Sequence, residues 1–186
     1  QPGDTGTLIL NSDEYRVTNT YFVEDKVMIV HQMNAVALMT FKVGDRVDML
    51  LDWERRHRHM RMHTSLHLMC YLISAQATGG SIGEMDSRID FDLQGQVVDK
   101  DNLTVEMNRL ITNQLAVSIG SITDEALAQN PSLVRTMSVQ PPKGQGSIRT
   151  VTILNTDYQP CGGTHVNNTA EIGEVIVTKI KNKGKQ

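Results

Sequence analysis

Residues 53–78 read WERRHRHMRMHTSLHLMCYLISAQAT, a stretch without glycine or proline that is rich in arginine, methionine, histidine and leucine. Gly79 and Gly80 follow it, in the place that a helix C-terminus prefers. The pattern therefore predicts one long helix over 53–78. Within it His63 and His67 are four residues apart, which places both imidazoles on one helix face about a turn from each other.

Upstream of this helix, residues 1–52 alternate short β-leaning segments with turn clusters, which predicts a small β-barrel-like unit. The predicted strand segments are 8–10, 21–23, 27–30 and 47–51. Downstream, strands and helices are interspersed without a strand-helix-strand rhythm, so that we expect an α+β fold with an antiparallel sheet rather than a doubly wound one. We accordingly expect two domains, 1–52 and 53–186.

From residue 89 onward the sequence predicts a series of short strands, helices and loops. In order these are a hairpin over 89–98 that turns at Gln94-Gly95, a helix over 102–115, a strand over 116–122, a short helix capped by Asp124, a loop over 141–146, and strands over 149–154 and 174–180. On the last strand the lysines occupy alternate positions after Val175 and Val177, so that one face would change from apolar to basic.

Composition excludes several classes of protein. With 186 residues and 39% hydrophobic residues the chain is long and apolar enough to bury a core, yet no apolar run approaches the roughly 20 residues that cross a bilayer. Two cysteines, Cys70 and Cys161, make a disulfide scaffold improbable. No export signal is found at the N-terminus. We therefore expect a cytoplasmic protein in a reducing compartment.

The net charge of −3 conceals two basic stretches. Each carries four positive charges without an acid, and the rest of the chain sums to −11. The members of the two stretches are Arg55, Arg56, Arg58 and Arg61, and Lys179, Lys181, Lys183 and Lys185. Such runs are solvated faces in most proteins, and a nucleic-acid-binding surface is the alternative.

A second pair of metal-binding residues lies 94 residues beyond His67. Cys161 and His165 have the same offset of four residues, within the glycine-rich segment Pro160-Cys161-Gly162-Gly163-Thr164-His165. Either pair alone is common on ordinary polar surfaces, but the two together, with mixed nitrogen and sulfur donors, favour one zinc ion over magnesium or calcium. Cys70, seven residues after His63, could compete as the sulfur ligand or be a buried apolar residue.

The sequence lacks the machinery of several enzymes. No glutamate follows His63 as in the His-Glu-x-x-His metalloproteases, and no nucleophile elbow or phosphate-binding loop is found. A peptidase, a serine hydrolase and an ATP-driven ligase are therefore disfavoured.

The two motifs together resemble the zinc motifs of the editing domain of alanyl-tRNA synthetase and of the free-standing AlaX editing proteins, with threonyl-tRNA synthetase editing domains as more distant relatives. Four further stretches extend the resemblance over the whole chain. They are 1–6, which resembles the end of a Gly-Gly-Gln motif, 53–62, 87–92, and 168–173, where Ala170 replaces the usual glycine. Because two glycines precede the first of these motifs in the family, we expect an N-terminally trimmed domain of the medium-length class.

The resemblance implies a zinc-dependent hydrolase that acts in trans on the ester bond of mischarged tRNA(Ala), carrying serine or glycine. It implies His63, His67, Cys161 and His165 as ligands, with Cys161 and His67 catalytic. We expect Thr64 to read the serine hydroxyl, unless it is a helix threonine that bonds its own backbone, with Gln1 and Arg88 as further substrate contacts. The tRNA acceptor end would bind Arg55, Arg56, Arg58, Arg61, Lys181 and Lys183.

Several alternatives stay open at this point. Four protein ligands would saturate a tetrahedral zinc ion, so that catalysis needs one loose ligand, for which Cys161 or His165 is our expectation, or an expanded coordination. No general base is identified, although Asp86 and Asp90 lie near the family's arginine segment. The rival functions are a non-catalytic zinc-stabilised RNA-binding module, a zinc hydrolase of small esters or amides, an editing domain of threonyl specificity, and an excised synthetase domain.

Overall fold

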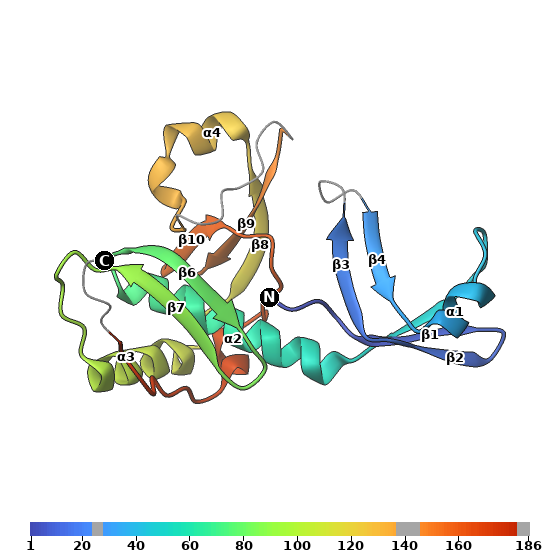
Figure 1. The fold of residues 1–186 in the computed structure, drawn as a ribbon. Helices are drawn as coiled ribbons and strands as arrows, with labels where there is room; N and C mark the ends of the chain where they lie inside the picture. The colour runs from blue at the N-terminus through green and yellow to red at the C-terminus, as the bar shows by residue number, and fades with distance from the viewer. Residues whose placement is uncertain (24–27, 137–145, 182–186) are drawn as a thin grey trace. The chain divides into compact units, whose positions relative to one another are not determined.

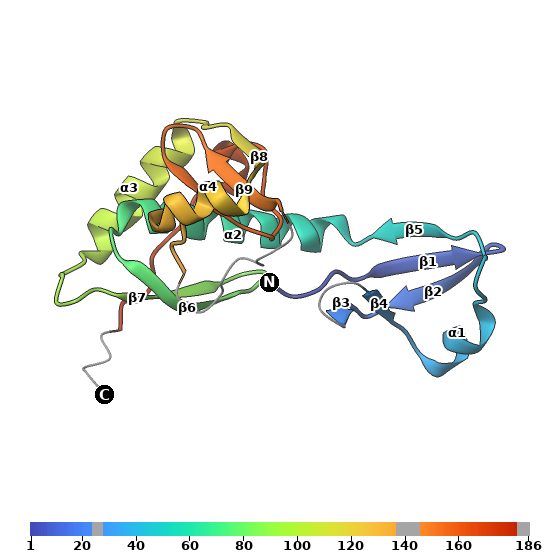
Figure 2. The same ribbon diagram turned by 90° about the horizontal axis from the view of Figure 1, so that it is seen from above.

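The computed structural model describes residues 1–23, 28–136 and 146–181, which divide into two units, 1–58 and 59–186. The fold is of the α+β class, because helices and small antiparallel sheets are interspersed along the chain (Figures 1 and 2). In the described ranges no helix is both long and apolar enough to span a membrane.

The described part of the first unit contains five short strands and one short helix ahead of the long central helix. They are β1 (Gly6–Leu10), β2 (Asp13–Val17), β3 (Asn19–Val23), β4 (Met28–Gln32), α1 (Ala35–Thr40) and β5 (Asp48–Leu51). The three-stranded sheet has the order β2-β1-β5, and β3 and β4 form a separate hairpin. The described strands of this unit make no closed sheet, so that the expected barrel-like form is not confirmed.

Helix α2 (Trp53–Leu72) begins in the first unit and is the central element of the second. Residues 64–68 are all buried, which means that neighbouring elements cover this part of the helix on every side. Leu68 of α2 packs with Leu110 and Ile111 of α3 (Lys100–Thr112) and with Ile153 of β9 (Ile148–Ile153). The apolar core thereby fixes α2 against α3 and the sheet.

The sheet of the second unit leads directly into the cysteine motif. Its order is β10-β9-β8, all antiparallel, with β8 at Val117–Ile122 and β10 at Asp157–Pro160. Cys161 therefore follows the last residue of β10. The remaining elements of this unit are β6 (Gln76–Ile82), β7 (Ser87–Asp92), α4 (Asp124–Gln129) and the short 3-10 helices η1 (Pro131–Leu133) and η2 (Thr169–Ile172).

Two expected elements end or turn elsewhere than predicted. The long helix stops at Leu72, and Gly79 and Gly80 lie inside β6 rather than at a helix end. The hairpin consists of β6 and β7, paired from Gln76↔Asp92 to Ile82↔Ser87. Gln94 and Gly95 do adopt positive φ, of 48° and 91°, but no strand follows them.

The predicted strand over 174–180 is wrong. Within 174–181 no strand is found, and the segment instead bonds to side chains of α3. The helix expected to be capped by Asp124 begins there, with Thr123 as its cap. The expected strands over 116–122 and 149–154 are confirmed by β8 and β9, and the expected helix over 102–115 by α3. The predicted loop over 141–146 lies outside the described residues except for Gly146.

Candidate metal centre

Four side chains from two distant segments converge in the second unit. His63 and His67 come from α2, and Cys161 and His165 come from the loop that follows β10. Their four potential ligand atoms lie within 4.8 Å of one another. The Sγ atom of Cys161 is 3.6 Å from Nε2 of His63 and 3.3 Å from Nε2 of His165. Such a cluster of nitrogen and sulfur donors could hold one metal ion.

The protonation of the two cysteines separates their roles. Burial would raise the pKa of Cys161, but hydrogen bonds to His165, His63 and His67 outweigh it and hold this pKa far below that of an ordinary thiol. Burial, together with the charge of Asp157, raises the pKa of Cys70 to about 12. Cys70 is 4% exposed and not part of the cluster, so that it is a buried neutral thiol and Cys161 is the sulfur donor.

Asp157 and Gln159 lie next to Nδ1 of His67, the ring nitrogen that faces away from the cluster. Because alternate residues of a strand point to the same face, both side chains of β10 are buried while Tyr158 between them is exposed. Oδ2 of Asp157 is 2.9 Å from Nδ1 of His67 and accepts a 2.8 Å hydrogen bond from Nε2 of Gln159. This arrangement keeps the proton of His67 on Nδ1 and turns Nε2 toward the cluster.

These contacts also shift the pKa of His67. Burial lowers its pKa, but the hydrogen bonds to Asp157 and Cys161 and the charges of both raise it to about 9. The pKa of His165 moves the other way, to about 4, because burial and the charges of His67 and His63 outweigh its contact with Cys161. In the metal-free chain Cys161 is therefore a thiolate and His67 an imidazolium.

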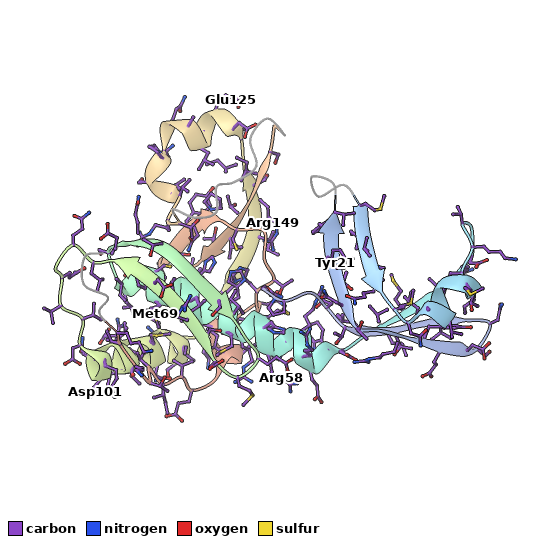
Figure 3. The ribbon with its side chains drawn as sticks, viewed as in Figure 1. Tyr21, Arg58, Met69, Asp101, Glu125 and Arg149 are labelled. Carbon is purple, nitrogen blue, oxygen red and sulfur yellow. The ribbon has the colours of Figure 1, made fainter. Side chains whose placement is uncertain are left out.

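His165 and Cys161 are supported as well. The hydroxyl of Thr64 donates to the backbone oxygen of Met60 at 2.9 Å and therefore accepts from Nδ1 of His165 at 3.1 Å, which leaves Nε2 for the cluster. Sγ of Cys161 accepts from the backbone N–H of Gly163 at 3.4 Å. Arg149, labelled in Figure 3, donates to the backbone oxygen of Cys161 and accepts from its N–H through its own backbone oxygen at 3.1 Å.

His63 differs from the other three. It is half-buried, and its Nδ1 is buried but has no hydrogen-bond partner in the part of the chain that the structure describes. The supporting residues Asp157, Gln159 and Arg149 were missed by the sequence reasoning. The one signal that could have found two of them is the Asp-x-Gln alternation immediately before Pro160-Cys161.

The three predicted substrate-binding residues differ in exposure: Thr64 is buried, whereas Arg88 and Gln1 are exposed. Thr64 is fully buried and its hydroxyl also accepts from the N–H of Val166 at 3.3 Å, which leaves it no hydrogen bond for a substrate. The Thr64 hydroxyl therefore bonds the helix backbone at Met60, and it also contacts the candidate metal ligand His165. Arg88 is exposed on β7, 3.3 Å from Asp90. Gln1 is exposed and belongs to the first unit.

Most of the predicted tRNA-binding arginines have partners within the protein. Arg55 donates to the backbone oxygen of Gly3, Arg56 pairs with Asp4, Arg58 lies 4.0 Å from Glu54, and Arg61 donates to the backbone oxygen of Ile172. Lys179 and Lys181 are exposed, whereas Lys183 and Lys185 lie outside the described residues. The arginines of this run therefore make contacts within the protein, and their binding to tRNA stays a prediction.

Comparison with known proteins supports the resemblance of the motifs. Residues 148–186 match the family described as "Threonyl and Alanyl tRNA synthetase second additional domain". The alanyl-tRNA editing protein AlaX-M of Methanosarcina acetivorans is 33% identical over 100% of this chain and 79% of the relative, and that of Methanosarcina barkeri is 34% identical with the same coverage. The chain belongs to the AlaX family of alanyl-tRNA editing proteins. The longer AlaX-L of Pyrococcus horikoshii is 29% identical over 100% of this chain and 45% of its own length.

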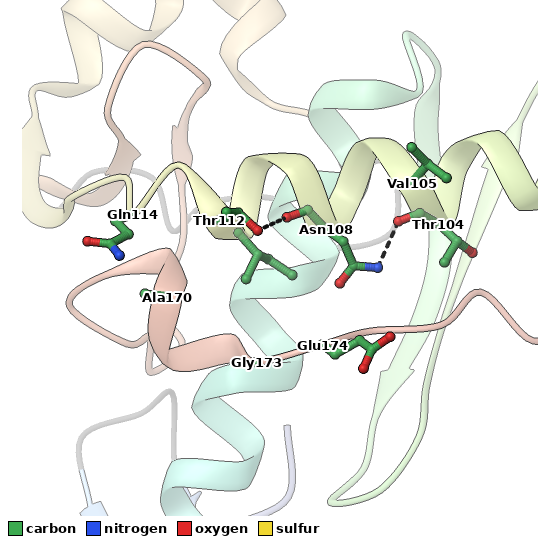
Figure 4. Close-up of a pocket in the computed structure, with 9 residues that line it drawn as sticks. Thr104, Val105, Asn108, Thr112, Gln114, Ala170, Gly173 and Glu174 are labelled. Atoms are coloured by element: carbon green, nitrogen blue, oxygen red, sulfur yellow. Dashed lines mark hydrogen bonds between the residues drawn. The ribbon is translucent and has the colours of Figure 1, made fainter.

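Membership in the AlaX family makes the chain an enzyme, a deacylase that hydrolyses mischarged aminoacyl-tRNA. A separate pocket in this unit, lined by α3 and by Ala170, Gly173 and Glu174, contains none of the four candidate ligands (Figure 4). The cluster of His63, His67, Cys161 and His165 is therefore the candidate site for the chemistry of an AlaX protein.

Proposed function

We propose that this chain hydrolyses, in a zinc-dependent reaction, the ester bond of tRNA(Ala) mischarged with serine or glycine, and that it acts in trans as a proofreading factor in the cytoplasm. The observation that carries the proposal is the convergence of His63, His67, Cys161 and His165, whose ligand atoms lie within 4.8 Å of one another. Three imidazoles and one thiolate are donors that suit zinc better than the hard cations magnesium and calcium.

A zinc ion bound by these residues would supply a Lewis acid that polarises the ester carbonyl or activates a water molecule. The chain's own part is to hold the donors in the required protonation states. Cys161 is a thiolate, and His67 would lose its Nε2 proton when the metal binds while its Nδ1–H continues to donate to Asp157. We propose catalytic roles for Cys161, the thiolate ligand, and for His67, the ligand that Asp157 holds.

The selection of serine over alanine requires a group that bonds the extra hydroxyl, because a site built for a hydroxyl rejects the analogue that lacks it far more strongly than an apolar pocket rejects an added one. Thr64 has no free hydrogen bond for this purpose. Arg88, with 64% of its side chain exposed, and Gln1 stay candidates for substrate contact. For the acceptor end of the tRNA we propose Arg58, Lys181 and Lys183 as phosphate contacts, and Arg55, Arg56 and Arg61 as residues that chiefly hold the protein together.

One experiment tests this function. Purified protein is incubated with Ser-tRNA(Ala), Gly-tRNA(Ala) and Ser-tRNA(Thr), before and after removal of metal with a chelator, and after zinc is added back. We expect release of serine from tRNA(Ala), loss of activity on chelation and recovery with zinc. His67→Ala should be inactive, and His31→Ala in the first unit is the matched control that should retain activity.

Each alternative predicts a different result. A non-catalytic RNA-binding module would bind tRNA without releasing any amino acid. An editing domain of threonyl specificity would release serine from tRNA(Thr) in preference to tRNA(Ala). Failure to release an amino acid from all three substrates in the presence of zinc would contradict the proposal.

A further inference from the structure

The four candidate ligands are not supported equally. Asp157 and Gln159 hold His67, Thr64 holds His165, and Gly163 and Arg149 hold Cys161. His63 is the exception, since its Nδ1 has no hydrogen-bond partner in 1–23, 28–136 and 146–181.

Such outer contacts determine how firmly a ligand is held. A hydrogen bond to the far nitrogen of an imidazole fixes its tautomer and its ring orientation, and loss of such a partner typically lowers metal affinity about 10- to 100-fold. His67 cannot turn away from the cluster without breaking its bond to Asp157, whose carboxylate is buried and would lose one of its partners. His165 would likewise leave the Thr64 hydroxyl without a donor. Rotation of His63 breaks no comparable bond.

Burial shows the same asymmetry. His67 and His165 are 5% and 6% exposed, whereas His63 and Cys161 are only half-buried. Beside Cys161, Gly162 is exposed, and a Cβ atom added there would have no neighbour within 4 Å. The open side of the cluster is therefore the side of His63 and Cys161. A substrate that reaches the cluster approaches on this side, and there Cys161 is held by the N–H of Gly163 and by two hydrogen bonds between its backbone and Arg149.

We propose that His63 is the exchangeable ligand of this centre, and that Asp157, Gln159 and Thr64 are positioning residues that make His67 and His165 its permanent ligands. The proposal rests on the proposed metal site. It answers how four candidate ligands are compatible with a catalytic zinc ion, which keeps only three permanent protein ligands. It also replaces the expectation that Cys161 or His165 is loose, because each of these has partners that His63 lacks.

The test measures metal affinity rather than activity. Zn²⁺ or Co²⁺ alone is titrated into the full chain against a competing chromophoric chelator. We expect His63→Ala to weaken binding less than His67→Ala or His165→Ala does. The Co²⁺ spectrum of His63→Ala should change when free imidazole is added and return toward that of the unsubstituted chain, whereas the spectra of the other two variants should not.

The positioning residues have their own variants. Asp157→Asn removes the negative charge with almost no change in shape, and Thr64→Val removes the hydroxyl, and each should weaken Zn²⁺ binding about 10- to 100-fold. Thr64→Ser should restore the affinity, which a merely structural loss would not do. Thr112→Val is the matched control, because the exposed Thr112 makes the same bond to the backbone four residues earlier but contacts no ligand. Asp101→Asn, on the surface of α3, is the control for charge.

The outcomes separate this inference from the proposed function. If the unsubstituted chain binds neither ion, the metal centre itself is wrong and the inference falls with it. If the chain binds zinc but His63→Ala costs as much affinity as His67→Ala, or if Asp157→Asn and Thr64→Val bind as tightly as the unsubstituted chain, the inference alone is overturned. Should Asp157→Asn fail to fold, the pair Thr64→Val and Thr64→Ser still decides.

Discussion

At the scale of single residues, the cluster depends on which cysteine is ionised. Cys161 is a thiolate because three imidazoles surround its sulfur, while Cys70, two turns further along the face of His63, is buried near the negative charge of Asp157 and keeps its proton. Spacing alone could not separate them, since both cysteines lie at offsets compatible with a ligand. Environment decides the question, because only the thiolate is a metal ligand.

The two cysteines therefore predict opposite results in a paired substitution. Cys161→Ser should lose most of the zinc-binding affinity and the deacylase activity, because a neutral hydroxyl replaces a thiolate. Cys70→Ser should retain one bound zinc per chain and change only thermal stability, since Cys70 contacts no ligand atom of the cluster. Zinc content after gel filtration and the melting temperature measure the two effects. Loss of zinc from Cys70→Ser would contradict the assignment.

The protonation of the cluster also predicts a pH dependence for the metal-free chain. Between pH 6.5 and about 4 the unfolded chain binds a proton at His165 and at Cys161 that the folded chain does not, because the folded-state pKa values of both groups are lowered. His67, whose pKa is raised, is protonated in both states over this range and contributes no slope. Between pH 9 and 6.5 the proton that the unfolded chain gains at Cys161 is balanced by the one that the folded chain gains at His67, so that stability changes little. Below pH 6.5 stability falls toward pH 4, by about 1.4 kcal/mol per pH unit for each proton.

Urea unfolding in the presence of a chelator at pH 7, 6 and 5 measures this slope. His165→Asn should make the slope shallower, because only the proton at Cys161 then distinguishes the unfolded from the folded chain. A metal-free chain equally stable at pH 5 and pH 7 would show that the folded cluster binds protons as the unfolded chain does.

At the scale of elements, α2 shows what sequence can and cannot predict. Its start at Trp53 and the common face of His63 and His67 follow from local pattern, as does the offset of Cys161 and His165. Its end does not, because Gly79 and Gly80 resemble a helix stop but are held in β6 by pairing with β7, a contact that a local pattern does not contain. The partners Asp157 and Gln159 were missed for the same reason, since their role depends on how β10 lies against α2.

The segment 174–181, which follows η2, was predicted to be a strand but bonds to side chains of α3 instead. Asn108 of α3 donates to the backbone oxygen of Val175 at 2.7 Å and accepts from its N–H at 3.0 Å, while Thr104 accepts from the N–H of Val177 at 3.1 Å. Figure 4 shows Asn108 and Thr104 on the side of α3 near this segment. Val175 and Val177 pack against the apolar clusters, so that the predicted alternation is correct although the predicted sheet is not.

Asn108→Ala should therefore release this segment. Both backbone groups of Val175 lose their partner, which should lower the free energy of unfolding by roughly 1–3 kcal/mol. Amide hydrogen exchange should become faster in 174–181 and stay unchanged in β8 and β9. Thr112→Val, on the same helix but without a contact to this segment, is the control. Unchanged exchange at Val175 and Val177 in Asn108→Ala would contradict this account.

At the scale of the whole molecule, the distribution of charge matters more than its sum. The net charge of −3 includes a run of arginines that is largely used inside the protein, such as Arg56 with Asp4 and Arg61 with the backbone of Ile172. The lysines near the C-terminus differ from these arginines, because Lys179 and Lys181 are exposed. They follow Val177, whose backbone bonds to Thr104 of α3. We therefore expect the exposed lysines near the C-terminus, more than the arginine run, to contact tRNA phosphates.

Lys181→Ala should accordingly raise the Michaelis constant for mischarged tRNA without abolishing hydrolysis, because phosphate contacts position the substrate and do not carry out the chemistry. Loss of one phosphate contact should reduce the slope of log affinity against log salt concentration by about 1. Arg56→Ala should instead lower the stability of the first unit, since Asp4 loses its partner. Lys100→Ala at the start of α3, next to Asp101, is the control for a lysine of ordinary surface. An unchanged salt slope in Lys181→Ala would remove this lysine from the proposed phosphate contacts and leave Arg58 and Lys183.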